Sequence, residues 1–231
     1  MDKINSIIPR TRMSNPSSMD YNWQIIKKFD MMFKFTKLMK KSIIISFILM
    51  LSGCEKPINR HNMCALFKDN TAWYRYHKYY EQKYKVPMAI TLAIIEKESG
   101  FKAHARPVKT WLIKNVIPWE YASSSYGYAQ ALDGSWSEFQ KAHKGEYHVR
   151  SAYKSNVAFI NWYLHKYADR YKSVEDKYLI YHNGPYSNPK KAKQSVLHYA
   201  KEVANKANTY DKQLKQCKLE LDWHLDWGPL R

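Results

Sequence analysis

Acidic residues are scarce in this sequence, which has 20 Asp and Glu against 38 Lys and Arg in 231 residues, a formal net charge of +18. Such a charge attracts nucleic acid, anionic lipid or an acidic cell-wall polymer, so it selects a class of partners without fixing a function. The chain also lacks C2H2 spacing, an RNP-type motif and any long Lys/Arg run. Proteins that bind nucleic acid often carry one of these motifs. Because this chain carries none of them, we expect no nucleic-acid partner.

The apolar run from Ile43 to Leu51 has only nine residues, which is too short to cross a bilayer. Four lysines lie upstream of it, between positions 34 and 41, and Ser-Gly-Cys54 follows it. This order is typical of a secretory signal, and the ending LSGC resembles the bacterial lipobox. We therefore expect a lipoprotein signal peptide at 31–53, lipidation of Cys54 and a lipidated tether at 54–63. An uncleaved anchor or a buried apolar segment are the alternatives.

A lipid on Cys54 would place the protein at a membrane, exported and facing the periplasm. The residue after the cysteine is Glu55 rather than an aspartate, which favours sorting to the outer membrane. We therefore expect the protein to be located there. Met31, Met32 and Met39 all stand just before or within the cationic stretch. Because a signal normally begins at its own methionine, residues 1–30 are expected to be a non-native extension.

Cysteine is rare, with three residues in the chain. If Cys54 carries lipid, Cys64 and Cys217 remain as an even pair in an exported protein, and we expect them to form a disulfide. The alternative is two unrelated free thiols.

Alternating strand patterns are few, and no internal repeat or low-complexity segment occurs. The chain is long enough for one well-packed domain, which we expect to be mainly α and to occupy residues 64–217. Residues 102–123, interrupted by Pro107 and Pro118, are expected to form a loop, and the tail 218–231 to pack back on the domain. Helices are predicted at 88–98, 133–142, 151–170, 174–182 and from the Asn188-Pro189 cap signal towards Cys217.

The helix predicted at 88–98 is apolar on all sides, which is typical of a buried central helix. Gly100 stands where a C-cap glycine would, so Glu98 falls in the last turn, at the mouth of the core. Glu96 and Glu98 point about 200° apart on a helix and cannot act on one bond. Glu98 shares its face with apolar side chains, and partial burial there favours the protonated acid that a glycosidic oxygen needs as a donor.

Three short blocks follow in order: Glu98-Ser99, then GYAQ at 127–130, then YHNGP at 181–185. Together they resemble the ESxF, GLMQ and AYNxGP blocks of the soluble-type lytic transglycosylases, over about residues 64–217. This resemblance implies a helical fold like that of goose-type lysozyme, with Glu98 as the catalytic acid and base. Glu96 has no counterpart in the family's blocks, so we expect it to have a structural role or to lie on the surface.

The resemblance also implies a set of substrate-binding residues in and beside the blocks. Gln130 would hydrogen-bond sugar groups or, alternatively, hold its loop to the helix. Tyr181 would orient the acid or the sugar or, alternatively, serve as a core tyrosine, and Gly127 would let backbone and glycan approach closely. The full expected set is Ser99, Tyr126, Gly127, Tyr128, Gln130, Tyr181 and Asn183.

The sequence departs from the family pattern in three places. His182 occupies the asparagine slot of the third block, and Asn183 comes one place later. Tyr128 and Ala129 replace the leucine and methionine of the second block. The link 102–123 is longer than usual, and we expect it to form a lid or an extra wall that affects substrate preference.

The resemblance implies cleavage of peptidoglycan glycan strands between N-acetylmuramic acid and N-acetylglucosamine, with a 1,6-anhydro product and no metal or cofactor. The basic surface suits this polymer, whose lactyl and peptide groups carry carboxylates. One alternative is a hydrolase that uses Asp133 or Glu120 to position water. Another is a lipid-anchored binding protein of the cell wall or of a secretion machinery, without activity.

Overall fold

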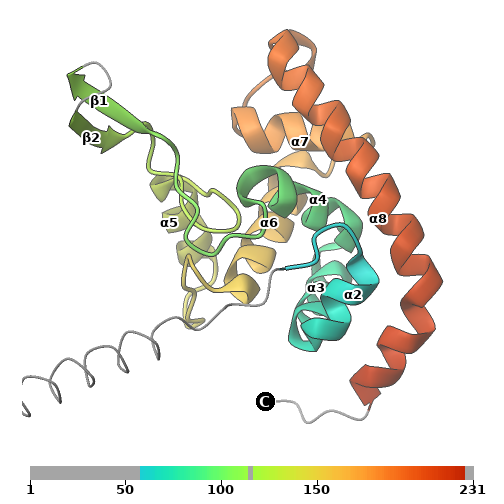
Figure 1. Ribbon diagram of the computed structural model, residues 1–231. Coiled ribbons are helices and arrows are strands. Elements are labelled where there is room, and N and C mark those ends of the chain that lie inside the picture. The colour runs from blue at the N-terminus through green and yellow to red at the C-terminus, as the bar shows by residue number, and fades with distance from the viewer. Residues whose placement is uncertain (1–57, 114–116, 227–231) are drawn as a thin grey trace, which may run out of the picture. The chain divides into compact units, whose positions relative to one another are not determined.

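The computed structural model describes residues 58–113 and 117–226, with the side chains of 111–119 and 224–226 excepted (Figure 1). The expected extension at 1–30, the signal peptide at 31–53 and Cys54 lie outside the described residues. Within the described ranges, no helix is both long enough and apolar enough to cross a membrane.

The fold is mainly helical, which confirms the predicted class. Short polar caps separate the helices. The Asn62 side chain accepts the Ala65 amide at the start of the first helix, and the Ser173 hydroxyl accepts the Asp176 amide at the start of another. The helices are α2 (Met63–Asp69), α3 (Thr71–Tyr84), α4 (Met88–Ser99), α5 (Asp133–Ala142), α6 (Tyr153–Ala168), α7 (Val174–Asn183), the 3-10 turn η1 (Pro189–Lys191) and α8 (Gln194–Asp226).

Helix α4 is the central helix, as its sequence predicts. Every side chain from Ala89 to Ile95 is buried, and the helix packs against α3, α6 and α8. Gly100 adopts the left-handed conformation (φ 58°, ψ 36°), and its amide donates to the Glu96 carbonyl at 2.9 Å. Helix α4 therefore ends where expected, with Glu98 in its last turn.

Helix α8 is longer and starts later than predicted. The Asn188 side chain caps η1 rather than the long helix, and α8 begins at Gln194. Residues 218–226, expected to form part of a tail, continue α8 instead. Leu221 is buried, and Asp222 accepts a hydrogen bond from the Tyr74 hydroxyl at 2.7 Å. The end of this helix is therefore part of the domain core.

The first and last parts of the domain are joined covalently. Cys64 of α2 and Cys217 of α8 form a disulfide whose Cα atoms are 6.0 Å apart, at a sequence separation of 153. Helices α2 and α8 also pack directly on one another. The bond therefore closes almost the whole domain into one loop.

Residues 102–123 were predicted to be a loop, and this prediction is wrong for their central part. Strands β1 (Lys109–Ile113) and β2 (Ile117–Tyr121) form an antiparallel hairpin in which Lys109 is paired with Tyr121. The hairpin projects from the helices (Figure 1). The side chains of Trp111 and Trp119 lie outside the described residues.

Candidate active site

The two glutamates at the end of α4 have different partners on different helices. The Tyr178 hydroxyl of α7 donates to Glu98 Oε1 at 3.1 Å. On the other side, Lys206 Nζ of α8 lies 3.4 Å from Glu96 Oε1, and the Tyr210 hydroxyl donates to Glu96 Oε2. Each carboxylate is 15% exposed. The divergence expected from helical phase is thus present, and burial alone does not distinguish the two acids.

Glu98 faces a cleft of about 380 Å³ between the segment that contains the second block, α6 and α7. Among the described residues, Glu98 is the only carboxylate in its lining. The lining consists of Glu98, Ser123, Ser125, Gln130, Ala131, Leu132, Ser135, Phe159, Tyr163, Tyr181, His182, Asn183, Gly184 and Pro185. The structure therefore brings residues of all three sequence blocks to one cavity.

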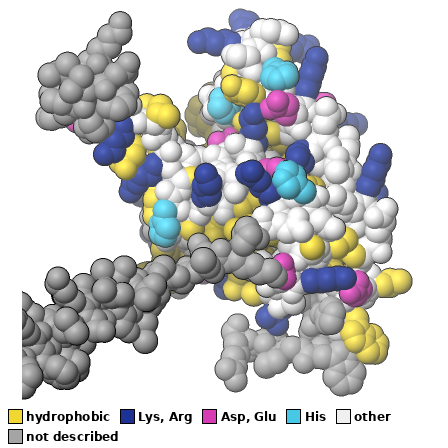
Figure 2. Space-filling view, in the orientation of Figure 1, with side chains coloured by type: hydrophobic (Ala, Val, Ile, Leu, Met, Phe, Trp, Pro, Cys, Tyr) yellow, Lys and Arg dark blue, Asp and Glu magenta, His cyan; other side chains and the backbone are white. Residues whose placement is uncertain are grey.

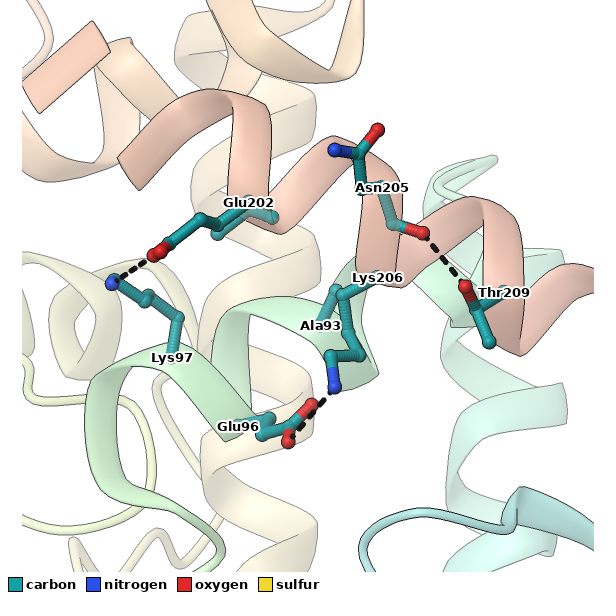
Figure 3. Close-up of a pocket in the computed structure, with 8 residues that line it drawn as sticks. Ala93, Glu96, Lys97, Glu202, Asn205, Lys206 and Thr209 are labelled. Atoms are coloured by element: carbon teal, nitrogen blue, oxygen red, sulfur yellow. Dashed lines mark hydrogen bonds and ion pairs between the residues drawn. The ribbon is translucent and has the colours of Figure 1, made fainter. Parts of the chain in front are cut away.

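Glu96 faces a different and larger hollow, of about 500 Å³, between α4 and α8 (Figure 3). The acids in this hollow are paired with lysines: Glu96 with Lys206, and Glu202 with Lys97 at 2.6 Å. The hydrogen bond from Lys97 lowers the pKa of Glu202 below its ordinary value. Both carboxylates of this hollow are thus engaged by lysine partners, whereas Glu98 has no lysine partner among the described residues.

Two side chains of α7 surround the Glu98 carboxylate. Tyr178 is 1% exposed, and His182 Nδ1 lies 3.9 Å from the same carboxylate oxygen. Their rings stack with centroids 5.7 Å apart. Burial, followed by the charge and hydrogen bond of Glu98, raises the pKa of Tyr178, so its hydroxyl remains a neutral donor. Sequence reasoning missed Tyr178, although its position three residues before Tyr181 places both on one side of α7.

Tyr181 lies in the cleft but does not bond the acid. Its hydroxyl donates to the Ala129 carbonyl at 2.5 Å, which ties α7 to the second block. Burial, and then the charge of Glu98, raises the pKa of Tyr181 well above its ordinary value, so it too stays neutral. The contact that was expected of Tyr181, orientation of the carboxyl group, is made by Tyr178 instead.

Gln130 lines the cleft, and its amide is already engaged by the surrounding loop. Its Nε2 donates to the carbonyls of Ala105 (2.9 Å) and Gly127 (2.8 Å), and its Oε1 accepts from the Ser125 hydroxyl at 3.1 Å. Both hydrogen atoms of the side-chain amide are therefore used within the protein. Of the two expected roles, sugar binding and holding the loop, these bonds correspond to holding the loop. Asn183, by contrast, is exposed at the edge of the cleft.

The other residues expected to bind substrate do not line the cleft. Gly127 has φ +79°, and a Cβ there would lie 2.1 Å from the Arg150 carbonyl oxygen. Glycine is thus required at position 127 because the backbone of Arg150 lies against it, and not because a glycan does. Tyr128 is 8% exposed and packs edge-on against Tyr153, with ring centroids 5.1 Å apart.

Ser99 and Tyr126 are also engaged within the protein. The Ser99 hydroxyl donates to the Ile95 carbonyl at 2.9 Å, inside α4. The Tyr126 hydroxyl lies 2.6 Å from His104 Nδ1, next to the base of the hairpin. Both residues shape the surroundings of the cleft and neither presents its hydroxyl in the lining.

The two acids considered as helpers of Glu98 are outside the cleft. Asp133, at the start of α5, is bonded to Arg150, and Glu120 is exposed on β2. The described part of the chain contains no group of three or more His, Cys, Asp or Glu side chains that could hold a metal ion. The cleft can therefore offer one carboxyl group, two tyrosines and a histidine to a substrate.

A mainly helical domain with one glutamate at the end of a buried helix, facing a cleft, has the arrangement of the lysozyme-like glycan-cleaving class. A family model described as "Transglycosylase SLT domain" matches residues 42–217, and the chain belongs to that family. Membership implies peptidoglycan as substrate and cleavage of the lytic-transglycosylase type. No curated protein matches the chain.

Proposed function

We propose that this protein cleaves the bond between N-acetylmuramic acid and N-acetylglucosamine of peptidoglycan and leaves 1,6-anhydro ends, with Glu98 as its single acid and base. The observation that carries the proposal is that Glu98 alone, among the described residues, presents a carboxyl group to the cleft. A classical hydrolase needs a second carboxylate to support the sugar or to activate water. A transglycosylase replaces it with a hydroxyl of the substrate.

The reaction balances with one residue. Glu98 gives its proton to the glycosidic oxygen, and the bond from that oxygen to C1 of the muramyl sugar breaks. The resulting carboxylate then takes the proton of the muramyl O6 hydroxyl, whose oxygen closes on C1. Glu98 is restored to its acid form, and no water is consumed.

Tyr178 supports both steps by its position. Its hydroxyl holds Glu98 Oε1 at 3.1 Å and leaves the other carboxylate oxygen free to face the sugar. Since the tyrosine remains neutral, it is a hydrogen-bond donor to the carboxylate throughout the cycle.

The water-using alternative receives less support from the geometry. Asp133 forms an ion pair with Arg150 and does not line the cleft, and Glu120 lies on strand β2 of the hairpin. The alternative of an inactive binding protein requires that Glu98 be unable to exchange protons with a sugar. The 15% exposure of its side chain towards the cleft speaks against that alternative.

The test is release of soluble material from dye-labelled wall sacculi by three proteins: wild type, Glu98→Gln and Glu96→Gln. We expect wild type and Glu96→Gln to release dye and Glu98→Gln to release none. Glu96→Gln is a matched control because it makes the same change two residues away in the same helix. Loss of activity in Glu96→Gln with retention in Glu98→Gln would reverse the assignment.

We also propose that Cys54 carries lipid and holds the domain at a membrane, with the outer membrane favoured by Glu55. This proposal is supported by the cationic, apolar and small-residue order of 34–54. Mass spectrometry of the mature N-terminus should find a diacylated cysteine, and Cys54→Ala should abolish it. A mature chain that begins elsewhere would refute the proposal.

A further inference from the structure

Four side chains form a basic and aromatic group at the base of the hairpin, here called the hairpin-base cluster: Arg106, Lys109, Tyr121 and Tyr126. The Arg106 guanidinium lies 4.4 Å from the ring centroid of Tyr126 and 4.9 Å from that of Tyr121. Lys109 Nζ lies 5.3 Å from the Tyr121 ring. Figure 2 shows Lys and Arg side chains beside hydrophobic ones at this place on the surface.

The cluster is held in place by backbone and side-chain contacts. Lys109 and Tyr121 are paired across the two strands, so they share one face of the hairpin. Tyr126 is fixed by its hydroxyl contact with His104 and by the Arg150 guanidinium, 5.6 Å from its ring. An arginine between two fixed rings loses little side-chain freedom when its guanidinium edge takes a ligand.

The charges of the cluster lack acidic partners. In the part of the chain that the structure describes, no carboxylate lies within ion-pair distance of Arg106 or Lys109. Glu120, the nearest acid in sequence to Tyr121, is exposed on β2 and makes no ion pair with either cation among the described residues. Elsewhere, Lys97, Lys206 and Arg150 each have a carboxylate partner. Two cations are thus exposed and uncompensated at one place.

The cluster is connected to the lining of the cleft through the backbone next to Arg106. The Ala105 carbonyl, just before Arg106, accepts from the Gly127 amide at 3.0 Å and from Gln130 Nε2 at 2.9 Å. Gln130 lines the cleft, as do Ser123 and Ser125, which lie between the two tyrosines in sequence. The residue just before Arg106 is therefore bonded directly to a residue of the cleft lining, which places the cluster beside the cleft.

We propose that the hairpin-base cluster binds a carboxylate of the peptide stem on the glycan strand in the cleft, and so determines which stems favour cleavage. A guanidinium edge matches a carboxylate with two parallel hydrogen bonds, and Lys109 adds a second positive charge. The inference rests on the proposed function, since it is the wall strand that brings the peptide to this place.

The test compares Arg106→Gln with wild type on two soluble substrates, peptide-bearing strands and strands from which the stems have been removed. On peptide-bearing strands we expect kcat/KM to fall about three- to fivefold, as for loss of an exposed charge-assisted pair. On peptide-free strands, which retain only the lactyl carboxylate, the two proteins should be equal. Arg106→Lys should recover part of the loss, because it restores the charge without the planar edge.

The matched control is Arg170→Gln. Arg170 is also an exposed arginine over a tyrosine ring, 4.9 Å from the centroid of Tyr171, and it does not line the cleft. It should leave both rates unchanged, which separates a local site from a general effect of net charge. Because Arg106 is exposed, thermal unfolding of Arg106→Gln should match wild type.

Binding of peptide-bearing strands to Glu98→Gln, with and without Arg106→Gln, gives a readout that does not need turnover. We expect about three- to fivefold weaker binding in the double variant. Equal binding, or an equal loss on both substrates, would overturn this inference while leaving the proposed function intact. Absence of cleavage by wild type would instead refute the proposed function.

Discussion

Replacing Tyr178 with phenylalanine is expected to lower kcat about tenfold and to leave KM nearly unchanged. The substitution removes one oxygen atom, the hydroxyl that donates to Glu98 Oε1 at 3.1 Å. The tyrosine ring is 1% exposed and keeps its packing in the variant. The effect should therefore be on the orientation of the carboxyl group rather than on the fold or the substrate.

The magnitude follows from the environment of the bond. A hydrogen bond to a charged group contributes about 1.5–3 kcal/mol when buried. Glu98 is 15% exposed, so water partly replaces the lost donor, and the lower end of that range applies. About 1.4 kcal/mol corresponds to a tenfold change in rate.

The assay is steady-state cleavage of soluble glycan strands, with kcat and KM measured separately. Tyr210→Phe is the matched control, because Tyr210 is equally buried and its hydroxyl donates to Glu96, the other glutamate of α4. We expect Tyr210→Phe to lower the melting temperature and to leave kcat unchanged. If Tyr178→Phe retains full kcat, or if Tyr210→Phe loses as much, the assignment of Tyr178 as the residue that positions Glu98 is wrong.

Three further predictions concern stability, each measured by urea unfolding. Reduction of the Cys64–Cys217 disulfide should lower the free energy of unfolding by about 5 kcal/mol, because the bond closes a loop of 153 positions; a loss under about 1 kcal/mol would contradict this entropic account. Burial lowers the pKa of His77 to about 3, so between pH 6.5 and 3 the unfolded state binds a proton that the folded state does not. From pH 7 to 5 wild type should therefore lose about 2 kcal/mol more than His77→Phe, and equal losses would refute the buried neutral histidine. Gly127→Ala should cost about 3 kcal/mol or more, because its Cβ would meet a backbone carbonyl at 2.1 Å, whereas Gly134→Ala, with open space around its Cβ, should cost nothing.

The position of Glu98 could be predicted from sequence because it depends on local rules. An all-apolar helix must be buried, and a left-handed glycine at position 100 ends it, so the last turn lies at the edge of the core. Helical phase then separates Glu98 from Glu96 without reference to the rest of the chain. These steps needed no knowledge of which helices pack on α4.

The partners of Glu98 could not be predicted in the same way. The bond from Tyr178 depends on how α7, which packs on α6 and α8, is placed relative to Glu98, 80 positions earlier in sequence, and no local pattern fixes that placement. The second block was read as a row of substrate-binding residues, whereas Gly127 and Tyr128 face the interior. A sequence motif contains residues that build a loop as well as residues that contact a ligand. The sequence alone does not show which residue has which role.

The hairpin at 109–121 was missed for a different reason. Its strands pair only with each other, in a two-stranded sheet that projects from the helices, and register shifts interrupt their pairing. Pro118 lies within β2, where a proline usually argues against a strand. In β2 the proline lies opposite Trp111, with a register shift on either side, and such irregular positions tolerate proline.

The central claim, that Glu98 alone cleaves the glycan without water, is tested most directly by mass spectrometry of the fragments that the protein releases from purified sacculi. We predict muramyl ends in the 1,6-anhydro form, one water lighter than hydrolysis products, from wild type and from Glu96→Gln, and no fragments from Glu98→Gln. Reducing ends in the wild-type digest, or anhydro ends from Glu98→Gln, would contradict the account.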